Sequence, residues 1–327
     1  MDSPVTIPIS TPFNIDVVHV EISSKCTLKC PRCPRTELSP SWLNQEISLE
    51  DFRAIFPPEV LGNISYLLFC GHTGDPIYAG DCLDIVQYVK QNSRTRIRLV
   101  TNGSYRKPDW WQRLGLLLDD DDGVIFSIDG WDHDSNNLYR VNSDWPSIML
   151  GMQTLRSNST CLIEWSMIYF SFNQDRKHDI LAQARTMGCD QVTLVRSSKF
   201  DLHYAVDGHD ALKPSADLVA QDNNYQRERH TLRRPEPFGI TSDRRVHAWA
   251  KCLNHAKEVN VVVDGTVHPC SWFNSGYQQN DFVDRYRDRL DARRRGLKAV
   301  LEDPIWSELT DRFDLDICRI KCKNAKI

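Results

Sequence analysis

The chain has 327 residues, of which 41% are hydrophobic and 26% charged, so it can bury a core and is neither disordered nor fibrous. Its formal net charge of −4 excludes a generally basic nucleic-acid coat, and no apolar run reaches the roughly 18 residues that a membrane span needs. Residues 1–16 carry no basic segment followed by an apolar one, so we expect no secretory signal and a cytoplasmic protein.

Strand and helix patterns alternate over the first two thirds of the chain. The predicted strands cover residues 17–22, 66–70, 97–101, 124–128, 161–170 and 191–195. The predicted helices between them cover residues 49–56, 81–91, 109–118, 146–156 and 175–187. Each crossover is long enough for a parallel βαβ unit, and six βα units predict an α/β fold with an incomplete (β/α)6 barrel. In such folds the chemistry lies on loops at the C-terminal ends of the strands.

The pattern changes after residue 195. Residues 196–251 lose periodicity, which predicts a linker or insert that contacts substrate. Basic and aromatic residues alternate over 226–251, either to hold a phosphate-bearing or nucleobase substrate or as a solvated loop. Residues 285–295 carry Arg and Asp at helical offsets and predict a salt-bridged helix face. We expect a barrel over 1–195, an insert over 196–251 and a small α+β domain over 252–327.

Cys26, Cys30 and Cys33 are three of eleven cysteines, an odd number that argues against disulfides in a chain without an export signal. Three thiolates on one loop can ligate three irons of a [4Fe–4S] cluster and leave the fourth iron open for substrate or cofactor. A zinc site that recruits His72 and incidental thiols are the alternatives. We expect four further cysteines to be buried as small hydrophobes: Cys70, Cys82, Cys161 and Cys189.

Four cysteines lie towards the C-terminus. Residues 261–268 predict a β-hairpin with Gly265 in its turn, so that cysteines flank a metal. Four thiolates are enough for one [4Fe–4S] cluster in which the protein ligates every iron. A zinc site and unliganded core thiols are the alternatives. These cysteines are Cys252, Cys270, Cys318 and Cys322.

These motifs resemble those of the radical S-adenosylmethionine (SAM) superfamily. The segments CTLKCPRC at 26–33, FCGHTGDP at 69–76, TNGS at 101–104 and SIDG at 127–130 follow successive predicted strands. The resemblance implies that SAM chelates the open iron and that its reduction releases a 5′-deoxyadenosyl radical, which abstracts hydrogen from substrate. It further implies SAM contacts by Gly71, Gly74 and Asp75 with the ammonium, Asn102, Ser127 and Asp129 with the ribose, and Arg140 with the carboxylate. The chain departs from the family at Asp75, commonly Glu, and at Arg32, commonly aromatic.

The spacing Cys-x12-Gly-x4-Cys from Cys252 to Cys270 resembles the start of the SPASM and twitch auxiliary-cluster domains. A full SPASM domain has about seven cysteines, so the four found here match the shorter twitch form. The resemblance implies a second [4Fe–4S] cluster, which relays one electron or stabilises the fold. It also implies an electron donor such as flavodoxin or ferredoxin.

Three functions are compatible with the sequence, and it identifies no catalytic acid or base. The leading hypothesis is a radical SAM enzyme that oxidises or rearranges a small molecule, nucleoside or nucleobase. The second is a peptide maturase with a separately encoded leader-recognition partner, since only about sixteen residues precede the first predicted strand. The third is a non-catalytic metal-binding protein that kept its cluster ligands for stability.

Overall fold

The structure is a computed structural model that describes residues 15–38, 44–196, 226–234, 258–270 and 281–306, together with residues 212 and 273. The chain divides into two compact units. The first unit comprises Met1–Lys25, Pro40–Ile97 and Ile240–Ile327. The second unit comprises Cys26–Ser39 and Arg98–Gly239. The predicted domain boundaries after residues 195 and 251 stay predictions.

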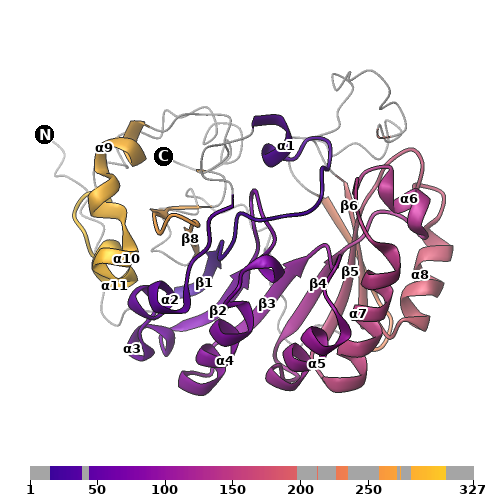
Figure 1. Ribbon diagram of the computed structural model, residues 1–327, viewed down its shortest axis with the longest axis horizontal. Helices are drawn as coiled ribbons and strands as arrows, with labels where there is room; N and C mark the ends of the chain where they lie inside the picture. The colour runs from indigo at the N-terminus through magenta and orange to yellow at the C-terminus, as the bar shows by residue number, and fades with distance from the viewer. Residues whose placement is uncertain are drawn as a thin grey trace, which may run out of the picture. The chain divides into compact units, whose positions relative to one another are not determined.

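The first unit is built on parallel strands (Figure 1). β1 (Ile15–Val20) pairs in parallel with β2 (Ile64–Phe69) on one side and with β8 (Glu258–Val261) on the other. β9 (Val267–His268) pairs antiparallel with β8, so the order is β2-β1-β8-β9. The helices of this unit are α2 (Leu49–Ile55), α3 (Pro58–Leu61), the 3-10 helix η1 (Pro76–Tyr78), α4 (Cys82–Asn92), α9 (Asp281–Leu290), α10 (Ala292–Arg295) and α11 (Leu297–Leu301).

The second unit continues the alternation of strand and helix. Its strands are β3 (Arg96–Thr101), β4 (Gly123–Ser127), β5 (Leu162–Ile168), β6 (Gln191–Arg196) and β7 (Gln226–Thr231), and the unit boundary falls inside β3. Its helices are α1 (Pro34–Leu38), α5 (Pro108–Leu117), α6 (His133–Asn137), α7 (Trp145–Asn158) and α8 (Lys177–Thr186). The order is β3-β4-β5-β6-β7, parallel from β3 to β6 and antiparallel at β7.

These elements confirm the α/β class expected of a partial (β/α)6 barrel, with six strands, β1 to β6, and helices in the five connections between them. The bounds of the predicted elements differ from the observed ones by a few residues at most, because helix and strand ends carry the weakest periodicity. Strand β7 pairs with β6 inside the range expected to lack periodicity and was not predicted. Its sequence, QRERHT, holds no large apolar residue, so it gives no alternating hydrophobic signal.

Apolar side chains join helices to strands within each unit. In the first unit, Ser48 caps α2, and buried Phe52 of that helix packs against Phe69 of β2, with ring centroids 6.1 Å apart. In the second unit, Trp111 of α5 lies 5.2 Å from Phe126 of β4. Gly151 of α7 permits this packing, because a Cβ atom there would lie 2.5 Å from the Trp111 Nε1 atom.

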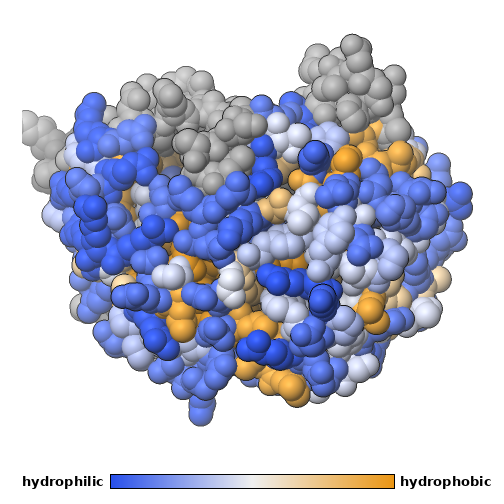
Figure 2. All heavy atoms as spheres, viewed as in Figure 1, coloured by the Kyte–Doolittle hydropathy of each residue, from blue (hydrophilic) through white to orange (hydrophobic). Residues whose placement is uncertain are grey.

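The C-terminal part of the first unit is strongly charged. The expected hairpin is present as β8 and β9, with Gly265 in the left-handed conformation at φ 83°. The expected salt bridges at helical spacing are also present: Arg287 lies 3.0 Å from Asp284, and Arg294 lies 3.4 Å from Asp291. Figure 2 shows this region covered by hydrophilic side chains. No helix within the described ranges combines the length and the apolar character that a membrane span requires.

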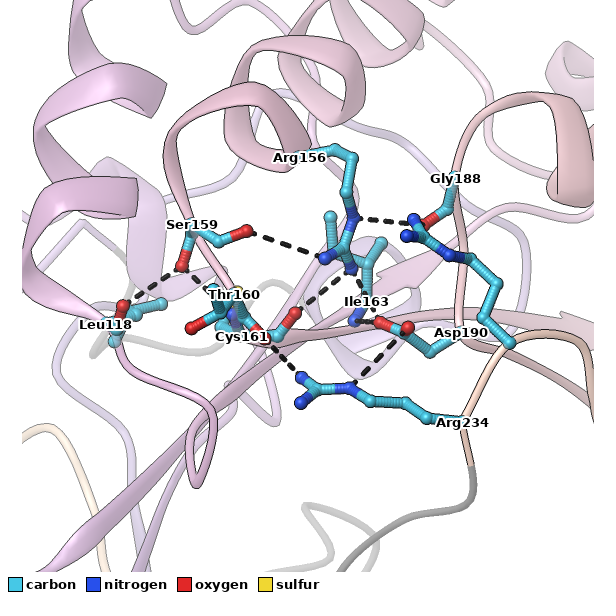
Figure 3. Close-up of polar contacts among 10 residues, drawn as sticks. Leu118, Arg156, Ser159, Thr160, Cys161, Ile163, Gly188, Asp190 and Arg234 are labelled. Atoms are coloured by element: carbon cyan, nitrogen blue, oxygen red, sulfur yellow. Dashed lines mark hydrogen bonds and ion pairs between the residues drawn. The ribbon is translucent and has the colours of Figure 1, made fainter.

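Asp190, immediately before β6, is the centre of a buried polar network in the second unit (Figure 3). Its Oδ2 atom accepts a hydrogen bond of 2.5 Å from Arg156 of α7 and one of 2.9 Å from the backbone N–H of Ile163 in β5. Its Oδ1 atom lies 3.6 Å from Arg234, which follows β7. Arg156 also donates to the carbonyl of Gly188 at 3.0 Å. One carboxylate therefore joins α7, β5, β6 and the segment after β7.

Replacing Asp190 with Ala should lower the free energy of unfolding by about 3–5 kcal/mol, because the largely buried Arg156 would lose its counter-charge and the buried Ile163 N–H its acceptor. Asp179→Ala is the matched control: it removes an exposed i,i+3 partner of Arg176 and should cost less than about 1 kcal/mol. Urea unfolding followed by circular dichroism measures both. Equal losses for the two variants would contradict a structural role for the network.

Candidate functional site

The three cysteines of the N-terminal motif lie together in the second unit. Cys30 belongs to a buried cluster with Leu28, Tyr139, Phe170 and Leu212. The other two cysteines of the motif, Cys26 and Cys33, are half-buried and pack against the same cluster. The fold thus gathers the three predicted iron ligands at one apolar surface.

The backbone of the cysteine loop is fixed by residues 139–142. The N–H of Lys29 donates to the carbonyl of Val141 at 2.9 Å, and the Asn142 side chain donates to the carbonyl of Thr27 at 2.8 Å. Arg32 takes a left-handed conformation with φ 61°, and its side chain pairs with Glu37 at 3.2 Å. A non-glycine residue in this region of φ is strained, and such strain is concentrated at functional sites.

A buried ion pair lies beside the cysteine cluster. The Nε atom of Arg140 donates to the Oδ2 atom of Asp129 at 2.5 Å, and the Asp129 side chain is fully buried. The Oδ1 atom of Asp129 accepts from the backbone N–H of Ile168 at 2.6 Å. The Asn173 side chain donates to the carbonyls of both Asp129 and Ile168, at 2.8 and 2.9 Å. Asp129 therefore connects the C-terminal ends of β4 and β5 and holds the Arg140 guanidinium.

Burial and neighbouring charges shift the pKa values of Asp129, Cys30 and Arg140 in opposite directions. Burial raises the pKa of Asp129, and the Arg140 guanidinium partly offsets that rise. Burial also raises the pKa of the Cys30 thiol to about 11, again against the effect of Arg140. Burial lowers the pKa of Arg140, but the neighbouring Asp129 and Cys30 outweigh it, so the pKa rises and the guanidinium stays charged. The site therefore contains a permanent positive charge next to a thiol.

As predicted, Asn102 directly follows β3, and Ser127 is the last residue of β4. The side-chain oxygen of Asn102 accepts from the Ser104 N–H at 2.9 Å, and its Nδ2 atom lies 3.7 Å from the sulfur of Cys26. Ser127 pairs in register with Ser166 of β5. Asn102 and Arg140 thus each place a hydrogen-bond donor near a cysteine sulfur, a contact that the sequence analysis did not predict.

Gly71, Gly74 and Asp75 belong to the first unit. A Cβ atom on Gly74 would lie 2.2 Å from the carbonyl oxygen of Ser23, so close backbone approach requires glycine there. A Cβ atom on Gly71 would lie 2.2 Å from the carbonyl oxygen of Gly74. Asp75 is buried, and its backbone N–H donates to the carbonyl of Lys25 at 2.9 Å. Its carboxylate caps η1 by accepting from the N–H of Ile77 at 3.2 Å. These contacts shape the loop, and the contacts of all three residues with SAM stay predictions.

Three cysteine thiols at one apolar surface are a donor set that an iron–sulfur cluster can use. Among the described residues, no group of three or more His, Cys, Asp or Glu side chains could hold one metal ion. A cubane cluster instead binds each thiolate at a different iron, so the sulfurs need not converge on one point. Amide and guanidinium donors near cysteine sulfurs are a recognised means of adjusting such clusters.

The remaining cysteines divide into two groups. Cys82, Cys161 and Cys189 are fully buried, as predicted, whereas Cys70 is half-buried and lies beside His19. Cys270 is half-buried and follows β9. Its three predicted partners, Cys252, Cys318 and Cys322, lie outside the described residues.

The fold is that of several solved structures. SuiB from Streptococcus suis bound to S-adenosylmethionine has a TM-score of 0.59 at 11% identity, over 91% of this chain and 66% of that chain. SuiB bound to the precursor peptide SuiA has a TM-score of 0.59 at 13% identity, over 91% and 67%. The chain therefore spans about two thirds of the length of the SuiB chains.

A third solved structure, anSMEcpe with bound AdoMet and the Cp18Cys peptide, has a TM-score of 0.56 at 13% identity, over 89% of this chain and 81% of that one. At identities of 11–13%, these structures confirm the predicted α/β fold. No protein-family model matches the chain. No curated protein matches it in sequence.

Replacing Arg140 with Ala should lower the free energy of unfolding by about 3–5 kcal/mol at pH 7, because Asp129 would stay buried without its counter-charge. The pKa of Asp129 is already raised and would rise further, so its contribution to stability is present at low pH and lost as pH rises through the folded-state pKa. Acidification from pH 7 to 5 should therefore recover part of the loss.

Arg294→Ala, which removes an exposed partner of Asp288, is the control for that variant. It should cost less than about 1 kcal/mol at both pH values. Urea unfolding midpoints measure the effect. If the loss in the Arg140 variant were independent of pH, Asp129 would not be the group left uncompensated.

Proposed function

We propose that this chain is a radical SAM enzyme that modifies a peptide. The observation that carries the proposal is the gathering of Cys26, Cys30 and Cys33 at one apolar cluster, with donors from Asn102 and Arg140 beside two of the sulfurs. The shared fold supports it, since SuiB and anSMEcpe were both solved with SAM bound.

The three cysteines would each hold one iron of a [4Fe–4S] cluster. Bound there, the cluster supplies the electron for reductive cleavage of SAM and the hydrogen-abstracting radical chemistry that follows. Asn102 and Arg140 would stabilise the negative charge of the thiolates, through an amide N–H near Cys26 and a guanidinium near Cys30. Apolar contacts from Tyr139 and Phe170 would limit the access of water.

The SAM contacts implied by the sequence become part of this proposal. Arg140 would bind the SAM carboxylate, and Asp129 would act as a positioning residue that holds the guanidinium. Gly71 and Gly74 would let the loop backbone approach the ligand, with Asp75 near its ammonium group. Asn102, Ser127 and Asp129 remain the residues predicted to contact the ribose.

The comparisons favour a peptide substrate over the small molecule or nucleobase that the sequence put first. SuiB was solved with the precursor peptide SuiA, and anSMEcpe with the Cp18Cys peptide. We include in the proposal a separately encoded partner that recognises the leader of the peptide, and a flavodoxin or ferredoxin as electron donor.

The proposal also includes a second [4Fe–4S] cluster at Cys252, Cys270, Cys318 and Cys322, with the role of relaying one electron. Its support is the spacing of the cysteines and the observed hairpin that leads into Cys270. Four cysteine ligands leave no open iron, so this cluster would carry charge rather than bind substrate.

With SAM, a reductant and candidate precursor peptides under anaerobic conditions, the reconstituted protein should form 5′-deoxyadenosine and a peptide of altered mass. The variant with Cys26, Cys30 and Cys33 all changed to Ala should lose about four irons and form neither product. Cys161→Ala, which removes a buried thiol outside the cluster, is the matched control and should form both. Mass spectrometry and iron analysis provide the measurements.

Unaltered 5′-deoxyadenosine production in the triple variant would refute the cluster assignment. Normal SAM cleavage that yields a modified nucleoside and leaves every peptide unchanged would instead restore the small-molecule hypothesis.

The second cluster makes a separate prediction. The reconstituted wild type should contain about eight irons per chain, and Cys270→Ala or Cys318→Ala about four. Because the metal would close a loop of nearly fifty residues between these cysteines, both variants should also be less soluble. They should still cleave SAM yet form little product. Zinc at this site, with only about four irons in the wild type, would contradict the relay and indicate a structural metal.

A further inference from the structure

A cysteine, a histidine and a glutamate meet on one side of the strands of the first unit. His19 lies in β1, Glu258 lies in the neighbouring strand β8, and Cys70 directly follows β2 (Figure 1). The sulfur of Cys70 is 3.6 Å from the Nδ1 atom of His19. The Nε2 atom of His19 is 3.3 Å from the Oε1 atom of Glu258. The three side chains thus form a continuous chain of polar contacts through both nitrogens of one imidazole.

A thiol beside an imidazole that is held by a carboxylate is the arrangement of an activated nucleophile. A thiol becomes reactive when a neighbouring base accepts its proton and a third group orients that base. The contact of Nε2 with a carboxylate favours a proton on that nitrogen, which leaves Nδ1 free to accept the proton of the thiol. We propose that Cys70 and His19 form a thiolate–imidazolium pair oriented by Glu258, and that Cys70 is a nucleophilic site for soft electrophiles.

The charges around His19 agree with this geometry. Burial by itself lowers the pKa of His19, but the contacts with Cys70 and Glu258 outweigh it and raise that pKa to about 10. The third titratable group near His19 is Glu21, two residues further along the chain. Burial raises the pKa of Glu21 to about 8, and its Oε1 atom accepts a 2.6 Å hydrogen bond from the His72 N–H. Glu21 therefore stays largely neutral below pH 7, while the imidazolium stays charged.

The reaction with an electrophile balances without a further reagent. The Cys70 sulfur transfers its proton to Nδ1 of His19 and then attacks the carbon of iodoacetamide. The sulfur–carbon bond forms as the carbon–iodine bond breaks, and iodide leaves. No oxidant or reductant is consumed. Cys70 directly precedes Gly71 of the predicted SAM loop, but none of the three residues of this site is one of the seven predicted cluster ligands, so its alkylation can be measured without cluster or SAM.

The test is the pH dependence of alkylation of the full-length folded protein by iodoacetamide. An ordinary thiol with a pKa near 8.5 reacts about thirtyfold more slowly at pH 5.5 than at pH 7. Cys70 in the wild type should slow by less than about threefold over that range. Comparing two pH values for the same residue removes the effect of partial burial on the absolute rate.

The chain provides its own control for folding. Cys70 and the fully buried Cys82 lie on one tryptic peptide, between Arg53 and Lys90, so tandem mass spectrometry reads both from the same fragment. Cys82 should stay unmodified as long as the first unit is folded. Labelling of Cys82 in a variant would show unfolding rather than altered chemistry.

His19→Gln should restore the thirtyfold slowing at Cys70, because glutamine cannot accept the proton. Glu258→Gln keeps the base but loses the orienting charge and should give an intermediate slowing. Thirtyfold slowing in the wild type, an unchanged profile in the folded His19 variant, or no labelling of Cys70 at any pH would each overturn the proposal. If Cys82 is labelled in the His19→Gln variant, that variant is unfolded, and the pH profiles of the wild type and of Glu258→Gln then test the proposal.

Discussion

The buried ion pair between Arg140 and Asp129 is the contact on which the candidate site depends. A carboxylate without exposure to water is costly unless it is paired and hydrogen-bonded, and Asp129 is both. Its partners lie on the turn that binds the cysteine loop and at the end of β5. The same guanidinium lies near Cys30, so the pair sets both the position and the charge of the surroundings of the cysteine cluster.

The parts of the fold with strong periodicity could be predicted from the sequence, and short or polar parts could not. The six strands and the long helices α4, α5, α7 and α8 carry apolar residues at the spacing their structure demands, so pattern alone locates them. Strand β7 is all polar, and α6 is five residues held by a capping box at Asp132, so neither gives a hydrophobic signal.

The candidate site was predicted as a set of residues, but not as a set of contacts. The spacing of three cysteines and the order of the loop motifs were enough to name the second-unit residues that the structure gathers. The sequence assigned Asp129 and Arg140 each to SAM but did not predict that they pair with each other, since a contact between residues eleven positions apart leaves no pattern in the chain. Likewise Cys70 looked like a core residue until His19, fifty-one positions away, was found beside it.

A shared fold at 11–13% identity leaves the chemistry to be argued from the site, because one fold supports many reactions. The central claim concerns the cysteine cluster: three thiolates ligate three irons and leave the fourth iron open to SAM. Electron paramagnetic resonance of the reduced, anaerobically reconstituted wild type tests this most directly. Adding SAM should shift the signal of about one cluster per chain, because the ligation of its open iron changes. A spectrum unchanged by saturating SAM in a protein that holds its full complement of iron would contradict the account.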